Sequence, residues 1–513
     1  MSGEQQRQSA SVSSARAERS ILDEIAAATE VRQSSGAAGQ TERPKLDEST
    51  RGWLKALLQE AMKGTLVWDR NLSLTIRKAI AAIDDLLSKQ VAEIMHHPDF
   101  KKLEGSWRGL HFLVDKTETG DKIRLKVMHC SKRDLTRDLE KATDFDQSEI
   151  YKKIYGPFDA FGAAPFGAIV GDYEFENTID DLDCLTRVSK VAAAAHCPFL
   201  SAASPNLMGF NSWQQLPNVR DLSKIFQTKE YVQWRAFRDS PASCYVTLTM
   251  PRVLARVPYG SKTKPIDEFS FEEVELGVDG KPKTVDHEKY VWTNAAYALA
   301  SRLTNAFDMY GFCTSIRGVE NGGKVDGLPV HIFQTDEGDW DQKCPTEVAI
   351  GGTREYELSK LGFMPLAHFA DTPYAVFIGA QTAQKPKTYM GERGAEATAN
   401  AAICARLPYL MAASRLSHYM KAMVRDKIGS FMERADIERY LNDWLANYKC
   451  ASGRASSESE RRRYPLKEYS VQVEEIPGRP GAYHVVLHLC PWLQLEELTT
   501  SMRMVAEIPW TKK

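Results

Sequence analysis

A strand, helix and strand follow one another between residues 167 and 203, and this order constrains the fold more than any other part of the chain. Gly167 to Gly171 is a short continuous apolar run of the kind found in buried strands. Thr178 can cap the next helix, and Phe199 to Ala203 is again a strand. The helix between them carries apolar residues at helical spacing, namely Ile179, Leu182, Leu185, Val188 and Val191. These three elements form a βαβ unit, so the fold contains a parallel sheet.

Other periodic segments extend this α/β pattern. We predict strands from the alternation of Ile123, Leu125 and Val127 and from the run through Cys244, Val246, Leu248 and Met250. Apolar spacing from Trp292 to Phe307 indicates a helix that stops at Gly311. The segment from Ala399 to Phe431 reads as one long helix kinked at Pro408. The fold class is therefore α/β with mixed α+β character.

A helical corner precedes this body. Pro98 forbids simple continuation of the helix before it, whose apolar residues recur at steps of three and four (Ile76, Ile80, Ile83, Leu87, Val91 and Ile94). Leu103, Trp107 and Leu110 then restart the same period. We expect these three side chains to pack in the interior and assign them no binding role. The stretch has no catalytic group.

Composition excludes several function classes. The 513 residues, 43% of them hydrophobic, allow roughly two to four domains. A formal charge of -2 argues against a nucleic-acid partner and against a polybasic membrane surface. No run approaches the roughly 18 apolar residues of a membrane span, and the N-terminal region lacks the apolar core of a secretory signal. Nine widely spaced cysteines without a Cys-x-x-Cys pair favour free thiols, and so a cytoplasmic location.

Two breaks in composition divide the chain. Residues 1–50 read as a flexible tail that contains one amphipathic helix at 20–31, capped by Ser20. Because a helix of this length is marginally stable alone, we expect its apolar face either to bind a partner or to dock on its own domain. A Ser-, Gly- and Arg-rich stretch at 451–463 reads as a flexible loop. The expected parts are thus a core at 51–395, a helical segment at 396–450 and C-terminal strands at 464–513.

Three candidate chemical sites are weak. The segment Gly318 to Val325 matches the G-x-x-x-x-G-K part of a phosphate-binding loop, which leaves a nucleotide-binding enzyme as the alternative function, but Val325 stands where Ser or Thr is needed. His484, His488 and Cys490 alternate on a predicted strand, yet residues 484 and 488 would lie about 13 Å apart, too far to share a metal ion. Glu272, Glu273 and Glu275 read as solvent-exposed. We therefore expect no catalytic, cofactor-binding or metal site, and hence a non-enzyme.

The C-terminal segment predicts a β-hairpin. Apolar residues alternate on both sides of a Pro- and Gly-rich turn at 476–481, as Tyr469, Val471 and Val473 before it and Tyr483, Val485, Leu487 and Leu489 after it. Such a hairpin offers an edge that another chain can extend by strand addition. It can equally close a sheet of its own domain.

Several motifs together resemble the large contractile-sheath subunit of bacterial type VI secretion, the TssC/VipB family. The similarity starts with Trp107-Arg108-Gly109-Leu110 and covers roughly residues 50–513 in order. It continues through Pro251-Arg-Val-Leu-Ala-Arg-Val-Pro-Tyr-Gly260, Gly318-Val-Glu-Asn-Gly-Gly323, Cys344-Pro-Thr-Glu347, Leu361-Gly-Phe363, Gln384-Lys-Pro-Lys387 and Arg415-Leu-Ser-His-Tyr-Met-Lys421.

Membership would imply a multidomain fold related to phage tail sheaths and a structural role. Family members pair with the small sheath subunit (TssB/VipA), stack with copies of themselves on a baseplate around an Hcp inner tube, and contract. The resemblance implies that strands exchanged between subunits include the segment from Tyr469 to Leu489. It also implies that a ClpV-type AAA+ unfoldase grips the N-terminal helix, here Ile21, Leu22, Asp23, Glu24 and Ile25. These are expectations from the family.

Overall fold

The computed structural model describes residues 72–159, 164–273, 286–335, 337–370, 372–391, 394–430, 432–450, 457–475, 483–492 and 494. The chain divides into two compact units, Met1–Ala82 and Ile83–Lys513. Of the first, only the start of α3 is described. The features below all belong to the second.

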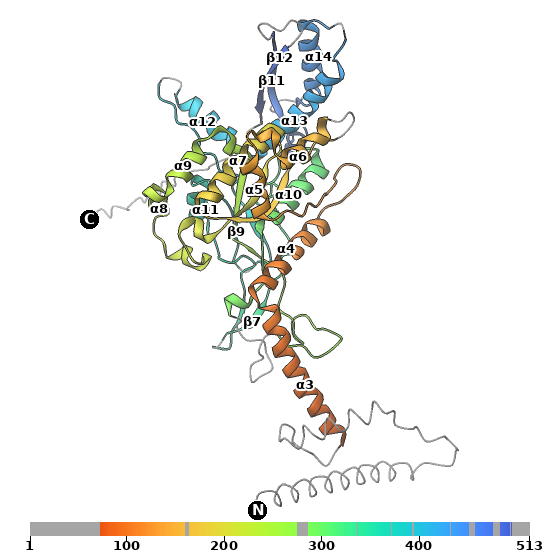
Figure 1. Ribbon diagram of the computed structural model, residues 1–513, viewed down its shortest axis with the longest axis vertical. Helices are drawn as coiled ribbons and strands as arrows, with labels where there is room; N and C mark the ends of the chain where they lie inside the picture. The colour runs from red at the N-terminus through yellow and green to blue at the C-terminus, as the bar shows by residue number, and fades with distance from the viewer. Residues whose placement is uncertain are drawn as a thin grey trace, which may run out of the picture. The chain divides into compact units, whose positions relative to one another are not determined.

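A six-stranded mixed sheet organises the second unit, with the strands in the order β1-β2-β3-β9-β10-β6. One of these strands, β9, is labelled in Figure 1. Strands β1, β2, β3 and β9 are parallel to one another. Strand β10 pairs antiparallel with β9, and β6 pairs antiparallel with β10. Their bounds are β1 Ile169–Phe175, β2 Phe199–Ala203, β3 Val246–Met250, β6 Lys324–Val325, β9 Met364–His368 and β10 Ala375–Phe377. The predicted parallel sheet is confirmed.

The βαβ unit forms where the sequence places it. Helix α7 (Ile179–Ala195) joins β1 to β2, and the hydroxyl of Thr178 accepts a hydrogen bond from the backbone N–H of Asp181. His196 ends α7 in the left-handed conformation, with φ 49°. Helix α10 (Ala295–Tyr310) likewise ends at Gly311, as predicted.

Two apolar clusters cover the opposite faces of the sheet. Phe199 of β2 belongs to the cluster with α5 (Lys132–Lys141), α7 and α9 (Val232–Asp239), whereas its neighbour Leu200 belongs to the cluster with α10. Consecutive strand residues point to opposite faces, which explains this division. The sheet is thus a buried central layer, which is the environment that parallel strands require.

The remaining elements surround this body. The other α-helices are α3 Leu72–Met95, α4 Pro98–Asp115, α6 Glu149–Asp159, α8 Ser223–Gln227, α11 Gly352–Lys360, α12 Gly394–Cys404, α13 Leu407–Asp426, α14 Arg434–Ala446 and α15 Glu458–Arg463. Two-stranded sheets pair β4 Val253–Leu254 with β5 Trp292–Thr293, β7 Ile332–Gln334 with β8 Trp340–Gln342, and β11 Leu466–Glu475 with β12 Tyr483–Pro491. Short 3₁₀ helices lie at Phe145–Gln147, Pro205–Met208, Trp213–Asn218, Lys229–Tyr231, Pro241–Tyr245 and His287–Lys289.

Three expectations about local structure are wrong. The stretch with Ile123, Leu125 and Val127 pairs with no described strand, so its alternation marks extended backbone without a ladder. The expected kinked helix is two helices, because α12 ends at Cys404 and Pro408 lies in the first turn of α13, where a missing N–H costs nothing. Residues 458–463 of the expected loop form α15, which a capping box between Ser457 and Glu460 starts.

Candidate assembly surfaces

The C-terminal hairpin is present as the sequence predicts. Strands β11 and β12 pair antiparallel with Tyr469 opposite Leu489, and this register holds from Glu468 to Glu475 and shifts between Leu466 and Glu468. All seven strand residues singled out in the sequence lie on one face, namely Tyr469, Val471, Val473, Tyr483, Val485, Leu487 and Leu489. This face is the packed one: Val471 and Val473 are fully buried, and the others are partly buried.

Helices α13 and α14 cover that face of the hairpin. Leu416 of α13 and Leu441 and Leu445 of α14 are fully buried in the same cluster, which Trp444 and Tyr448 extend. The hairpin, α14 and the end of α13 therefore share one small core. Of the described residues, only the segment at Tyr448–Cys450 bonds to an outer edge of this sheet, at Leu466. Beyond that point the structure shows a two-stranded sheet with open edges.

Polar contacts join this small core to the central sheet region. Gln494, just after β12, accepts a hydrogen bond from the Arg317 guanidinium and donates one to the Thr314 carbonyl, at 2.7 and 2.6 Å. The Arg462 guanidinium donates to the Tyr310 hydroxyl at 3.0 Å. Arg317 and Thr314 precede the glycine-rich segment 318–323, so that segment lies at the junction between the two regions.

The glycine-rich segment does not build a phosphate site. Lys324 starts strand β6 instead of a helix, and its ammonium lies 2.9 Å from the Asp326 carboxylate and 4.3 Å from the Tyr374 ring centroid. A Cβ at Gly323 would meet the Phe377 carbonyl at 2.5 Å, so the turn packs directly against β10. A phosphate loop needs the exposed N-terminus of a helix at this place, which the segment lacks.

Helix α4 packs through glycines and leaves its aromatic residue outside. A Cβ at Gly105 would lie 2.4 Å from the Trp292 carbonyl oxygen, and one at Gly109 would lie 2.3 Å from the Thr293 hydroxyl. These small residues let the helix backbone approach β5 and α10. The expectation that Leu103 and Trp107 pack is therefore wrong: they are 56% and 64% exposed, on the opposite face, and only Leu110 is partly buried.

The exposed face of α4 continues an apolar stripe on α3. Large apolar side chains of the second unit that are exposed on the two helices are Ile83, Leu86, Leu87, Ile94, Phe100, Leu103, Trp107 and Val114. Spacings of three, four and seven residues place them on one side of each helix. Exposed apolar patches of this kind mark interaction sites in soluble proteins. The helical spacing of these apolar residues is visible in the sequence. The prediction from that spacing, however, is an interior position for Leu103 and Trp107, and their exposure contradicts it.

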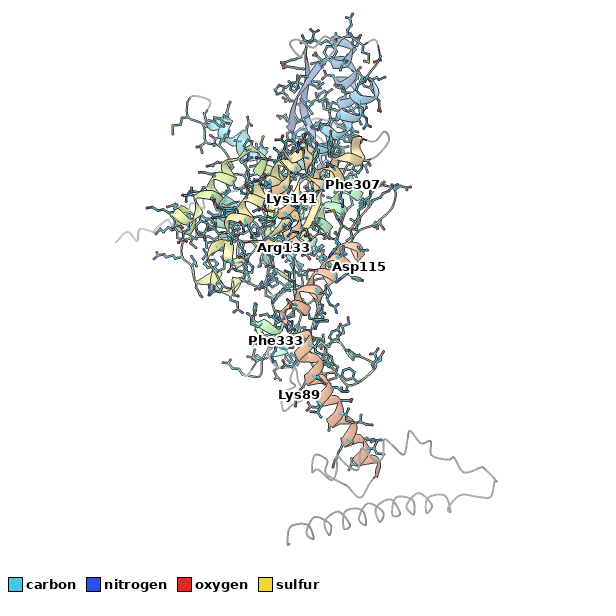
Figure 2. The ribbon with its side chains drawn as sticks, viewed as in Figure 1. Lys89, Asp115, Arg133, Lys141, Phe307 and Phe333 are labelled. Carbon is cyan, nitrogen blue, oxygen red and sulfur yellow. The ribbon has the colours of Figure 1, made fainter. Side chains whose placement is uncertain are left out.

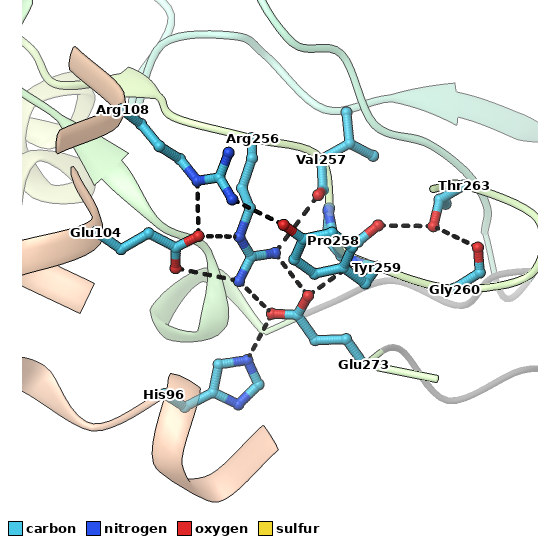
Figure 3. A network of polar contacts seen from close by, with 10 residues as sticks. All are labelled: His96, Glu104, Arg108, Arg256, Val257, Pro258, Tyr259, Gly260, Thr263 and Glu273. Atoms are coloured by element: carbon cyan, nitrogen blue, oxygen red, sulfur yellow. Dashed lines mark hydrogen bonds and ion pairs between the residues drawn. The ribbon is translucent and has the colours of Figure 1, made fainter. Parts of the chain in front are cut away.

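A buried ion network fixes the corner between α3 and α4 (Figure 3). The Arg256 guanidinium lies between the carboxylates of Glu104 and Glu273, with nitrogen–oxygen distances of 2.6 Å to each. Glu104 also accepts from Arg108, and Glu273 bonds to His96 at 3.1 Å. Burial opposes ionisation of Glu273, but these partners prevail and lower its pKa to about 2. The expectation that Glu273 is solvent-exposed is wrong.

Other candidate residues are quickly placed. His484, His488 and Cys490 lie on the exposed face of the hairpin, and the described residues hold no cluster of three metal-ligating side chains. All nine cysteines are free, as expected. Residues Ile21 to Ile25 and the tail at 1–50 lie outside the described residues. In the described part of the chain, no helix is both long and apolar enough to cross a bilayer.

Comparisons with known proteins define the class of this chain. Residues 77–384 match the family model described as EvpB/VC_A0108, tail sheath N-terminal domain, and residues 396–508 match the accompanying tail sheath gpW/gp25-like domain. A curated relative, the type VI secretion system sheath protein TssC1 of Pseudomonas aeruginosa, is 47% identical over 477 residues, covering 92% of this chain and 93% of the relative. The chain is thus a tail sheath protein.

More narrowly, the chain belongs to the VipB/TssC family of type VI secretion sheath proteins. The resemblance inferred from the motifs is therefore confirmed, and with it a structural role in a contractile sheath. Solved structures align more distantly. A chain of the anti-feeding prophage baseplate aligns at TM-score 0.37 and 11% identity, covering 78% of this chain and 87% of that chain. A chain of the contracted sheath of the same prophage aligns at TM-score 0.30 and 13% identity, covering 62% and 66%.

Proposed function

We propose that this chain pairs with the small sheath subunit and that the pairs stack, together with further copies and on a baseplate, as a helical tube around an Hcp inner tube. Contraction of this sheath would then drive the inner tube outward. The observation that carries the proposal is the hairpin of β11 and β12, which pairs with no other described strand and has its own supporting core.

An open-edged hairpin suits a mechanical link between subunits. Strands from neighbouring chains would extend the hydrogen-bond ladder of this two-stranded sheet and stabilise the contact between chains. Main-chain bonds of this kind hold chains together while the rigid bodies rotate. The side chains of Val471 and Val473 face inward onto α14, so the backbone edges, and not these side chains, would make the contact.

The apolar stripe on α3 and α4 supports the pairing step. The side chain of Leu86 is 67% exposed and that of Trp107 is 64% exposed, and contact of such apolar surface with water is unfavourable. A partner helix with an apolar face of its own would cover this stripe. The small subunit is the partner that family membership suggests, and the stripe would then be buried in every pair before the pairs stack.

Hydrogen exchange tests the strand link. Amides in residues 466–475 and 483–491 are expected to exchange more slowly in assembled tubes than in dissociated pairs, because neighbouring strands would occupy the open edges. The peptide at 223–231, from α8 and the following turn, serves as the control and should change little. Equal exchange of the hairpin amides in the two states would contradict the strand link.

The N-terminal helix carries a separate part of the proposal. A ClpV-type AAA+ unfoldase would grip the helix containing Ile21, Leu22 and Ile25 after contraction and return the subunits for reuse. Leu22→Asp places a charge on the apolar face and should abolish unfoldase binding without affecting assembly. Glu30→Gln, within the same predicted helix but outside the five residues assigned to the unfoldase, is the matched control. Unchanged binding of the Leu22→Asp chain would exclude this helix as the recognition site.

A further inference from the structure

A cavity lies along the free edge of β7, away from the hairpin and the apolar stripe. It has a volume of about 530 Å³ and lies between residues 255–257, the Lys262–Lys264 turn and residues 329–332. Phe333, labelled in Figure 2, marks the middle of β7.

The pairing of β7 with β8 leaves backbone groups aimed away from β8. Ile332 pairs with Gln342, and the Lys343 N–H donates to the His331 carbonyl at 2.8 Å. In an antiparallel ladder this bond makes His331 and Phe333 the hydrogen-bonded positions. Val330 and Ile332 therefore turn their N–H and C=O groups outward, to the cavity side, where no described backbone group bonds to them.

The walls of the cavity carry positive charge. Lys262 and Lys264 are exposed at its rim, and Arg108 and Arg256 line it. The two arginines are already paired with Glu104 and Glu273, so the two lysines supply the uncompensated charge. Among the described residues, none of those that line the cavity carries a carboxylate.

Two buried polar atoms lack partners at this place. His331 lines the cavity and is fully buried; its Nδ1 lies 2.8 Å from the Tyr290 hydroxyl, and its Nε2 has no partner among the described residues. A second cavity of about 80 Å³ shares Arg108, Ala255 and Pro329 with the first and has mostly apolar walls. The Thr293 hydroxyl on its wall is the other unpartnered group. An occupant of the two cavities would supply hydrogen-bond partners for these two atoms.

We propose that this cavity binds an extended segment of another protein chain, which adds a strand to β7, places a carboxylate near Lys262 and Lys264, and inserts a small aliphatic side chain into the adjoining 80 Å³ cavity. Strand addition would satisfy the outward groups of Val330 and Ile332, and pockets for alternate side chains would select the segment. The inference rests on the proposed function only in that the assembly supplies the other chain.

Photo-crosslinking tests the site in the full chain co-produced with the small sheath subunit. The photoreactive residue p-benzoylphenylalanine is placed at position 332, and at position 340 of β8 as the control, because Trp340 is similarly exposed on the other strand. We expect position 332 to cross-link to an acidic, extended peptide of another chain, and position 340 to give at least tenfold less of that product.

Charge reversal provides the second arm. Lys262→Glu with Lys264→Glu should reduce the cross-link from position 332 at least tenfold, whereas Lys224→Glu with Lys229→Glu, on a distant exposed turn, should leave it within twofold. Cross-links only within the chain, for example to residues 274–285, would overturn the proposal, as would a yield insensitive to the lysine reversal. The cross-link is measured whether or not tubes form. Failure of tube assembly therefore counts against the proposed function, whereas failure of the cross-link counts against this site.

Discussion

Val473 of β11 lies directly opposite Val485 of β12, and both side chains belong to the apolar cluster beneath the hairpin. Their neighbours Gln472 and Val486 form the next pair and turn to the other face. This alternation gives the hairpin one packed and one open face. Apart from the bridge at Leu466, no described strand pairs with the outer backbone edges of β11 and β12.

The two faces of β11 predict opposite responses to the same substitution. Val473→Asp buries a carboxylate without a partner and should lower the free energy of unfolding by about 3 kcal/mol or more. Gln472→Asp, one residue away on the exposed face, should change it by less than about 0.5 kcal/mol. Urea unfolding followed by tryptophan fluorescence measures both. Similar effects for the two variants would mean that the hairpin does not pack on α14.

The close approach of α4 to α10 predicts that a methyl group is harmful there. Gly109→Ala would put a Cβ 2.4 Å from the Tyr297 ring and should destabilise the protein by about 1–3 kcal/mol through overpacking. Gly352→Ala is the control, because that glycine begins helix α11, has nothing within 4 Å of its Cβ position, and alanine favours helices. A Gly109→Ala protein as stable as the parent would contradict the close packing of this corner.

Breaking the buried ion network should cost far more than breaking a surface pair. Arg256→Met leaves Glu104 and Glu273 facing each other without their shared cation, and we expect a loss of about 3–5 kcal/mol in unfolding free energy. Lys152→Met removes the exposed pair with Glu149, which solvent screens, and should leave the free energy of unfolding nearly unchanged. Equal losses in urea titrations of the two variants would show that the network adds no more than a surface contact.

Buried histidines predict that stability falls in mild acid. Burial, with smaller contributions from Lys421 and His418, lowers the pKa of His196 to about 4. The unfolded chain, with a histidine pKa near its ordinary value of about 6.5, therefore binds more protons between pH 6.5 and pH 4. Stability due to neutral His196 is complete above pH 6.5 and is lost as the pH falls towards 4.

Replacing His196 tests this account. Asparagine tolerates the left-handed backbone at this position and does not titrate, so His196→Asn should reduce the fall in the urea midpoint between pH 7 and pH 4.5. Some dependence should remain, because burial also lowers the pKa of His331 to about 4. An unchanged pH profile in the variant would exclude His196 as a contributor.

Local patterns were enough to predict the βαβ unit and the hairpin. The helix at 179–195 has its own cap and period, and the strands alternate or run apolar within a few residues. The same reasoning failed for Trp107, because the helical period shows only that two faces differ. It does not show which face packs. The packed face here contains Gly105 and Gly109, which have no side chains and so add nothing to a pattern of apolar residues.

Long-range pairing explains the other failures. Glu273 is buried because Arg256, Glu104 and His96 come together around it, and no short window contains all four residues. The stretch from Ile123 to Val127 alternates like a strand, but a strand also needs a neighbour, which alternation cannot supply. The edge of β7 cannot be predicted from the sequence for the same reason. The side of β7 that faces away from β8 is defined by where β8 and residues 255–257 lie in the fold.

Negative-stain electron microscopy of this chain co-expressed with its small sheath partner tests the central claim most directly. The account predicts hollow tubes of uniform diameter that require both chains. Persistently globular particles from a well-folded, co-purified pair would contradict it.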